Sequence, residues 1–310
     1  MLLEVFFVII GFILLIKGAD FLVDGASNFA KKLHIPEIVI GLTIVSIGTS
    51  MPELFVSITS ALDGYSDISV GNIIGSNIAN LLLILGVSAT IRPISFKRET
   101  IKYEIQICLG ITLLFYILAN SDNTINQTES LILIFFFILF VIYTIVLAKK
   151  KKDNIEDIKT NTSYFLDIVF MILGGVCLKF GGDFVVDNAV KIAHTLKISE
   201  KVISITVLAL GTSLPELVTS IHAARKGQSD LAIGNIIGSN IFNILLIIGV
   251  SAFIKPIAYN PSYNRDLIIF FSALIILKVF AHTKPKEKMS RLNGIFYFGL
   301  YIIYIMLLFL

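Results

Sequence analysis

The chain alternates between long apolar runs and short polar connections. A helix needs about 20 apolar residues to cross the hydrocarbon core of a bilayer, and most of the runs reach that length. Backbone groups in lipid must be hydrogen-bonded within their own segment, so each run is predicted to be a helix. The ten runs occupy residues 3–23, 37–61, 68–91, 101–119, 130–148, 164–186, 200–224, 230–254, 266–281 and 294–310.

Composition agrees with a membrane protein rather than a soluble one. The 310 residues are 56% hydrophobic and 15% charged, whereas soluble domains carry roughly 25% charged residues. The net charge of +3 says little by itself, and no nucleic-acid-binding module is visible. The lipid bilayer is therefore the expected environment.

The positions of the basic residues predict the orientation of the chain. Counted from the N-terminus, the odd connections hold 17 Lys and Arg residues, whereas the even connections and the termini hold 5. Basic residues collect on the cytoplasmic side. We therefore expect the odd connections in the cytoplasm, both termini outside, and a multi-pass location in the cell (inner) membrane.

Three blocks of sequence recur at a constant offset of 163 residues. Gly71-Asn-Ile-Ile-Gly-Ser-Asn-Ile-Ala-Asn80 matches Gly234-Asn-Ile-Ile-Gly-Ser-Asn-Ile-Phe-Asn243 at nine of ten positions. Gly48-Thr-Ser-Met-Pro-Glu-Leu54 recurs as Gly211-Thr-Ser-Leu-Pro-Glu-Leu217. The third pair of blocks begins at Gly18 and Gly181 and contains Asp20, Asp24, Asp183 and Asp187. Helix-end capping or interface charge is the favoured role for these aspartates.

The repeat is predicted to be inverted. Between a span in the first half and its copy the chain crosses the bilayer five times, and an odd number of crossings reverses the direction of the copy. Inverted repeats are the architecture of many alternating-access transporters. The predicted organisation is a first five-helix repeat over residues 1–148, a cytoplasmic linker over 149–163, and a second repeat over 164–310.

Each repeat places one glutamate deep in an apolar run. Glu53 and Glu216 converge on one central site if the halves are inverted, and an ionisable residue inside a membrane is a functional candidate by default. Pro52 removes a backbone donor and clashes with the preceding turn, so the helix is predicted to break there. The segments Ser50–Glu53 and Ser213–Glu216 are predicted to be capping boxes that restart each helix.

Further oxygen ligands are predicted around the two glutamates. The ends of the broken helices expose carbonyl groups at the negative end of a helix dipole. In the blocks Gly71–Asn80 and Gly234–Asn243, a serine and an asparagine four residues apart share a helix face. The candidates are Thr49, Ser50, Thr212, Ser213, Ser76, Asn80, Ser239 and Asn243. Asn72 and Asn235 lie on or near the same face, and interhelical bonding is an equally good role for Asn77 and Asn240.

The ligand chemistry favours calcium, with sodium as its monovalent rival. The repeated blocks offer carboxylate, carbonyl, hydroxyl and amide oxygens and contain no His or Cys. Calcium takes 6–8 oxygens in a flexible geometry, whereas soft metals prefer sulfur or imidazole. An empty site with two carboxylates is costly to move through the bilayer, and a loaded one is neutralised. This charge balance indicates an antiporter, and a proton remains an alternative counter-ion.

At these residues the chain resembles the calcium/cation antiporter superfamily, in particular the prokaryotic sodium/calcium exchangers. The resemblance rests on Gly-Thr-Ser-x-Pro-Glu and Gly-Asn-x-x-Gly-Ser-Asn, both present twice. It implies an all-α membrane protein with ten transmembrane helices, in which the first and sixth helices slide against the rest. It further implies that Glu53 and Glu216 are ligands shared by calcium and sodium and that Thr49 and Thr212 supply oxygens to calcium. The implied sodium-site residues are Ser46, Ser50, Ser76, Ala209, Ser213 and Ser239, with Asn80 and Asn243 flanking the central position.

Some alternatives stay open within this resemblance. Some family members carry an aspartate at the position of Asn243, so the central site here has lost one acid. The expected function is exchange of Ca²⁺ for Na⁺, and the alternative is an H⁺/Ca²⁺ or K⁺-dependent Na⁺/Ca²⁺ exchanger. Motifs typical of intramembrane hydrolases, such as His-Glu-x-x-His, are absent. We expect no enzymatic activity, no cofactor other than the transported ions, and function as a monomer.

Overall fold

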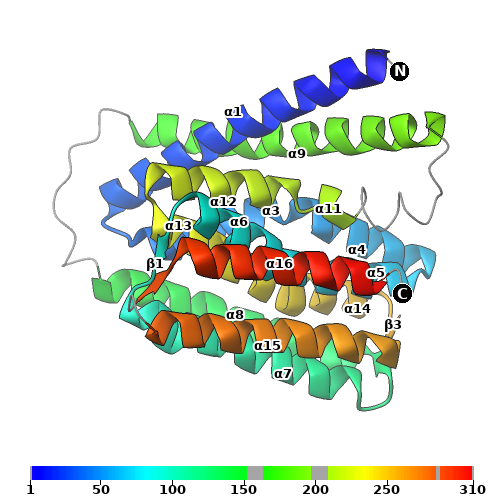
Figure 1. Ribbon diagram of the computed structural model, residues 1–310. Helices are drawn as coiled ribbons and strands as arrows, with labels where there is room; N and C mark the ends of the chain where they lie inside the picture. The colour runs from blue at the N-terminus through cyan, green and yellow to red at the C-terminus, as the bar shows by residue number, and fades with distance from the viewer. Residues whose placement is uncertain (1, 152–162, 197–208, 284–286, 309–310) are drawn as a thin grey trace.

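The fold is a bundle of helices that run along one common direction (Figure 1). The computed structural model describes residues 2–151, 163–196, 209–283 and 287–308. The first repeat contains α1 (Leu2–Leu33), α2 (Glu37–Ile40), η1 (Gly41–Val45), α3 (Ser46–Thr49), α4 (Met51–Asp63), α5 (Ser66–Ile78), η2 (Ala79–Leu85), α6 (Gly86–Ile91), β1 (Ile94–Ser95), η3 (Thr100–Glu104), α7 (Ile105–Ala119), β2 (Thr124–Ile125) and α8 (Gln127–Lys151). The second contains α9 (Tyr164–Thr195), α11 (Ala209–Gly211), α12 (Leu214–Lys226), α13 (Ser229–Phe242), η6 (Asn243–Ile248), α14 (Gly249–Ile254), β3 (Ile257–Ala258), η7 (Pro261–Tyr263), α15 (Asn264–His282), β4 (Lys288–Met289) and α16 (Arg291–Leu308).

The helices occur where the hydrophobic pattern predicts them. Among the described residues, seven helices are long and apolar enough to cross a membrane, and the bent pair from Glu37 to Asp63 makes an eighth. The predicted run 200–224 is described only from Ala209 onward, where α11 and α12 occupy it. The predicted run 266–281 is α15, a 19-residue helix that carries Arg265, Asp266 and Lys278. Most of the predicted linker, 149–163, lies outside the described residues.

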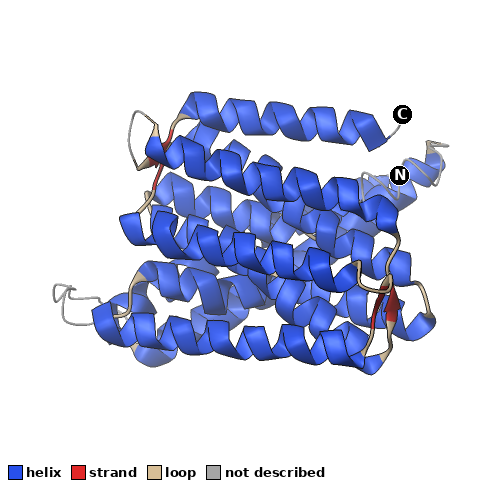
Figure 2. Ribbon diagram, turned by 90° about the horizontal axis from the view of Figure 1, so that it is seen from below, coloured by secondary structure: helices blue, strands red, loops and turns tan. Residues whose placement is uncertain are grey.

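Two small antiparallel sheets mark the inversion. The strand β1 pairs with β4, and β2 pairs with β3. Ile94 in β1 and Ile257 in β3 are separated by the repeat offset, yet the two sheets lie at opposite ends of the bundle (Figure 2). Equivalent segments of the two repeats therefore point in opposite directions, as the odd number of crossings requires.

The helices α1 and α9 pack against each other and form a layer over the remaining helices (Figure 1). Glycines of one helix lie close to the backbone of glycines in the other. A Cβ atom on Gly18 would lie 2.9 Å from the carbonyl oxygen of Gly174, and one on Gly11 would lie 2.8 Å from that of Gly181. Small residues at a helix crossing let backbones approach closely in membranes. These four glycines make α1 and α9 one closely packed pair.

Candidate functional site

The predicted helix break exists, but the capping boxes do not. The helical segment Glu37–Thr49, which ends in α3, meets α4 at Ser50, and the two are bent by 50° relative to each other. Pro52 stands in the first turn of α4, where its missing N–H is tolerated. Neither Ser50 nor Ser213 makes a side-chain capping bond to its own helix. The capping-box prediction is therefore wrong, because both hydroxyls are engaged elsewhere.

The two serines bond across the repeats instead. The Ser50 hydroxyl donates to Oε1 of Glu216 at 2.8 Å, and the Ser213 hydroxyl lies 3.4 Å from Oε1 of Glu53. The Ser76 hydroxyl lies 3.5 Å from the same Glu53 oxygen. Each broken helix thus orients the glutamate of the other repeat. Both carboxylates are 1% exposed, so the prediction that Glu53 and Glu216 converge in the interior is confirmed.

Two helices change pitch where they pass the glutamates. The α-helix α5 continues into the π-helical segment η2 at Ala79, and α13 continues into η6 at Asn243. Wide π-helical turns often mark functional sites. They lie at Asn80 and Asn243, and nothing in the hydrophobic pattern predicts them.

Four asparagines link the two repeats at these turns. The Asn243 amide donates to Oδ1 of Asn77 at 2.9 Å, and the Asn80 amide donates to Oδ1 of Asn240 at 3.0 Å. The bonds engage the amino groups of Asn80 and Asn243 and leave their Oδ1 atoms without a partner among the described residues. Asn77 and Asn240 therefore act in interhelical bonding and also orient the predicted ligands.

Further hydrogen bonds link Thr49 and Thr212 to the opposite repeat. The Thr49 hydroxyl donates to Oδ1 of Asn235 at 3.1 Å, and the Asn235 amide donates to the Ser220 hydroxyl at 2.9 Å. The symmetric set joins Thr212 to Asn72 at 3.4 Å and Asn72 to Ser57 at 3.2 Å. Ser57 and Ser220 were not among the predicted site residues. Their separation of 163 residues, the repeat offset, is the signal that identifies them.

Four buried oxygen atoms in the centre have no hydrogen-bond partner within the described part of the chain. They are Oε2 of Glu53, Oε2 of Glu216, Oδ1 of Asn80 and Oδ1 of Asn243. Buried polar atoms in proteins are nearly always satisfied. All four are hard acceptors, contributed in equal number by the two repeats. This donor set suits a hard cation such as Ca²⁺ or Na⁺.

The remaining predicted ligands lie beside this centre. The Ser239 hydroxyl lies 3.0 Å from that of Ser50, and the Ser76 hydroxyl lies 3.2 Å from that of Ser213. Ser46 is buried, and its hydroxyl donates to the Thr43 carbonyl at 3.0 Å. Ala209 begins α11, but its side chain lies outside the described set. Whether these residues bind ions stays a prediction.

Equivalent residues of the two repeats are not equally accessible. Gly71, Asn72 and Gly75 of α5 are partly exposed, whereas their copies in α13, including Asn235, are buried. Backbone contacts with α2 and η1 cover α13, since a Cβ on Gly234 would lie 2.8 Å from the Ile38 carbonyl oxygen. Residues 200–208, the copy of that segment, lie outside the described residues.

Two cavities reach the site from the end of the bundle where α4 finishes. One, of about 350 Å³, is lined by Pro52, Asp183, Asp187 and Thr212. Another, of about 360 Å³, is lined by Asn72, Ser76 and again Thr212. Towards the opposite end, α1 is tied to α12, because Asp20 pairs with His222 at 2.7 Å and Lys226 donates to Asp24 at 2.5 Å. Within the described part of the chain, both cavities therefore give access to Thr212 from the end where α4 finishes.

Comparisons with known proteins agree along the whole chain. The profile of the family described as sodium/calcium exchanger protein matches residues 3–146 and 166–310. The inner membrane protein YrbG of Escherichia coli (strain K12) is 35% identical over 100% of this chain and 98% of its own length. The sodium/calcium exchanger MaX1 of Methanosarcina acetivorans is 31% identical over 97% of each chain.

Solved structures of a sodium-calcium exchanger are similar to this chain over nearly its whole length. The sodium-calcium exchanger NCX_Mj, soaked with Na⁺ and Ca²⁺, superposes with a TM-score of 0.86 at 33% sequence identity, over 98% of both chains. This match confirms the predicted exchanger fold of two inverted five-helix repeats. The chain belongs to the sodium/calcium exchanger protein family.

Proposed function

We propose that this protein is a secondary active antiporter that exchanges Ca²⁺ for Na⁺ across the membrane by alternating access. The observation that carries the proposal is the set of four unpartnered oxygens on Glu53, Glu216, Asn80 and Asn243. Relatives named as sodium/calcium exchangers, MaX1 and NCX_Mj, support the choice of ions. Nothing in the site favours enzymatic chemistry over ion binding.

Charge balance explains why binding and movement are coupled. The two carboxylates are buried, and no Lys, Arg or His of the described residues lies within ion-pair distance of either one. An unpaired buried charge is strongly destabilising. A calcium ion, or several sodium ions, cancels the charge that the empty site must otherwise carry through a low-dielectric barrier. Exchange rather than free leakage follows from this preference for the loaded site.

The proposed roles of the site residues follow the symmetric contacts. Glu53 and Glu216 are ligands shared by both ions, and Asn80 and Asn243 flank the central position with their free carbonyl oxygens. Thr49 and Thr212 contribute oxygens to calcium at the ends of the broken helices. The sodium positions are assigned to Ser46, Ser50, Ser76, Ala209, Ser213 and Ser239.

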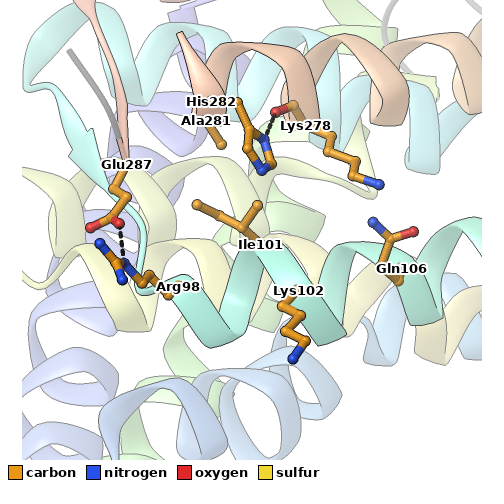
Figure 3. A pocket seen from close by; sticks show the side chains of 8 residues that line it. All are labelled: Arg98, Ile101, Lys102, Gln106, Lys278, Ala281, His282 and Glu287. Carbon is orange, nitrogen blue, oxygen red and sulfur yellow. Dashed lines mark hydrogen bonds and ion pairs between the residues drawn. The ribbon is translucent and has the colours of Figure 1, made fainter. Parts of the chain in front are cut away.

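The proposed orientation places both termini outside the cell and the open cavities on the outer side. A basic cavity at the other end of the bundle, where α7 begins and α15 finishes, supports this orientation. It has a volume of about 600 Å³ and is lined by Arg98, Lys102, Lys278 and His282 (Figure 3). The one acid among its described lining residues, Glu287, accepts a hydrogen bond from Arg98 at 2.6 Å. Basic residues at one face are typical of the cytoplasmic side. YrbG carries the name inner membrane protein, which supports the same membrane here.

The test is calcium uptake by proteoliposomes under imposed gradients. We expect an outward sodium gradient to drive ⁴⁵Ca²⁺ uptake, and we expect no uptake when choline replaces sodium inside. Potassium is then added or removed on each side, and a proton gradient is imposed in separate vesicles. Uptake driven by protons but not by sodium would contradict the sodium assignment, and a strict need for potassium would favour the K⁺-dependent alternative.

Replacing Asn77 with alanine is expected to weaken calcium binding about tenfold. The Asn243 amide loses its acceptor at 2.9 Å, and an unsatisfied buried donor costs about 1–3 kcal/mol. The amide then rotates, and its free carbonyl oxygen leaves the centre. The measurement is the calcium dependence of exchange, expressed as KM.

Asn243→Ala and the double variant provide the control. If Asn77 acts by orienting Asn243, the double variant is no worse than Asn243→Ala alone, because the two losses share one cause. Additive losses would mean that Asn77 has a separate role.

A further inference from the structure

A buried carboxylate lies outside the exchange site, in the first turn of α15. Asp266 is 7% exposed, and its Oδ1 atom has no hydrogen-bond partner among the described residues. No Lys, Arg or His within that set lies within ion-pair distance, and the neighbouring Arg265 is exposed. The Asp266 side chain hydrogen-bonds with Tyr304 of α16, which leaves one carboxylate oxygen free. A buried acid without a basic partner is costly and indicates a functional role.

Asp266 faces the path to the exchange site. The cavity of about 360 Å³ that contains Asn72, Ser76 and Thr212 is also lined by Asp266 and by Tyr304 of α16. Asp67 lies at its exposed mouth, and its carbonyl accepts from the Tyr263 hydroxyl at 2.9 Å. One continuous cavity thus holds an exposed acid, a buried acid and the hydroxyl and amide groups of the site.

The other repeat holds a buried acid in the matching place. The helices α7 and α15 can be aligned by their buried positions. Phe115 then corresponds to Leu277 and Ala119 to Ala281, and Glu104 corresponds to Asp266. Glu104 accepts a hydrogen bond from Tyr143 at 2.7 Å. No described cavity joins Glu104 to the exchange site. Glu104 therefore provides a matched control for Asp266.

We infer that Asp266 is an accessory cation-binding site, which holds a Ca²⁺ or Na⁺ ion that enters from the outer side before it reaches Glu53 and Glu216. The direction of this path rests on the proposed function, whereas the binding of a cation does not. One carboxylate and nearby hydroxyls fall short of the 6–8 oxygens that tight calcium binding requires. The site therefore binds weakly and releases its ion quickly, as a transit position must.

The first test measures transport from each side. Asp266→Asn is expected to raise the KM for external calcium about 3- to 10-fold, since an acid that lines a narrow cavity raises the local cation concentration and the association rate. Maximal rate and the KM at the inner face should stay near wild type, and Glu104→Gln should leave the external KM unchanged. An equal rise at both faces, or the same rise in Glu104→Gln, would mean a structural role and would overturn the inference.

The second test does not depend on transport. A double variant with Glu53→Gln and Glu216→Gln lacks the charge of the exchange site. Any remaining weak cation site can then be measured by titrating Mn²⁺ and recording its paramagnetic relaxation effect. We expect residual millimolar Mn²⁺ binding that adding Asp266→Asn removes and adding Asp266→Glu keeps. No loss of Mn²⁺ binding in the folded triple variant would overturn the inference. Failure of sodium-driven calcium uptake by the wild type would contradict only the proposed exchange.

Discussion

Replacing Glu216 with glutamine is expected to abolish calcium exchange. The glutamine can still accept the Ser50 hydrogen bond of 2.8 Å through its remaining oxygen, so the fold should survive. The unpartnered Oε2 becomes an amino group that repels a cation. Removing one partner of a buried charge pair costs about 3–5 kcal/mol, which corresponds to a loss of about 100- to 4,000-fold in affinity.

The measurement is sodium-driven ⁴⁵Ca²⁺ uptake, together with calcium binding by calorimetry on the detergent-solubilised protein. Glu53→Gln should behave in the same way, because Ser213 and Ser76 contact Glu53 as Ser50 contacts Glu216. Glu129→Gln, at the start of α8 and far along the chain from the repeated blocks, is a control expected to match wild type. Near-normal calcium uptake by either site variant would refute the role of shared ligand.

Replacing Gly174 with valine is expected to disrupt the α1–α9 pair and with it transport. A Cβ atom at this position would lie 2.6 Å from the Leu22 amide nitrogen and 2.8 Å from the Gly18 carbonyl oxygen. Backbone atoms cannot move aside as a flexible side chain can, so the helices must separate. Overpacking typically costs about 1–3 kcal/mol, and a clash with backbone should reach the upper end of that range. We expect a lower unfolding temperature and exchange reduced more than about tenfold.

Gly175→Val is the matched control on the same helix. A Cβ atom on Gly175 meets no described atom within 4 Å, and the substitution has the same intrinsic effect on helix propensity. Thermal unfolding and exchange of this variant should stay near wild type. Equal damage in both variants would mean that helix propensity, not close packing of α1 on α9, is responsible.

The chemistry of the site was predictable where it depends on local composition. A proline that follows glycine and small polar residues disfavours a continuous helix, so the interruption before Glu53 was visible without a fold. The choice of oxygen ligands was visible for the same reason. Ser57 and Ser220 were missed because a lone serine on a helix face is unremarkable until its partner, Asn72 or Asn235, is known.

Partners across the repeats could not be predicted from the same information. A serine before a helix can cap its own chain or bond elsewhere, and local sequence favours the cap. Ser50 bonds to Glu216 instead, because the inverted repeat brings that carboxylate to 2.8 Å. The amide pairs Asn77–Asn243 and Asn80–Asn240 likewise join segments that are more than 150 residues apart.

By itself the sequence determined the membrane-spanning helices, the inversion of the repeats and the two buried glutamates. Hydrophobic length, the number of crossings and the duplicated motifs are properties of the chain that need no packing. Only the tertiary structure decided which oxygens are left without partners, which side the cavities open to, and that Asp266 lines the same cavity as Ser76. Those properties arise from the positions of separate helices relative to one another, which identical motifs in the two repeats do not specify.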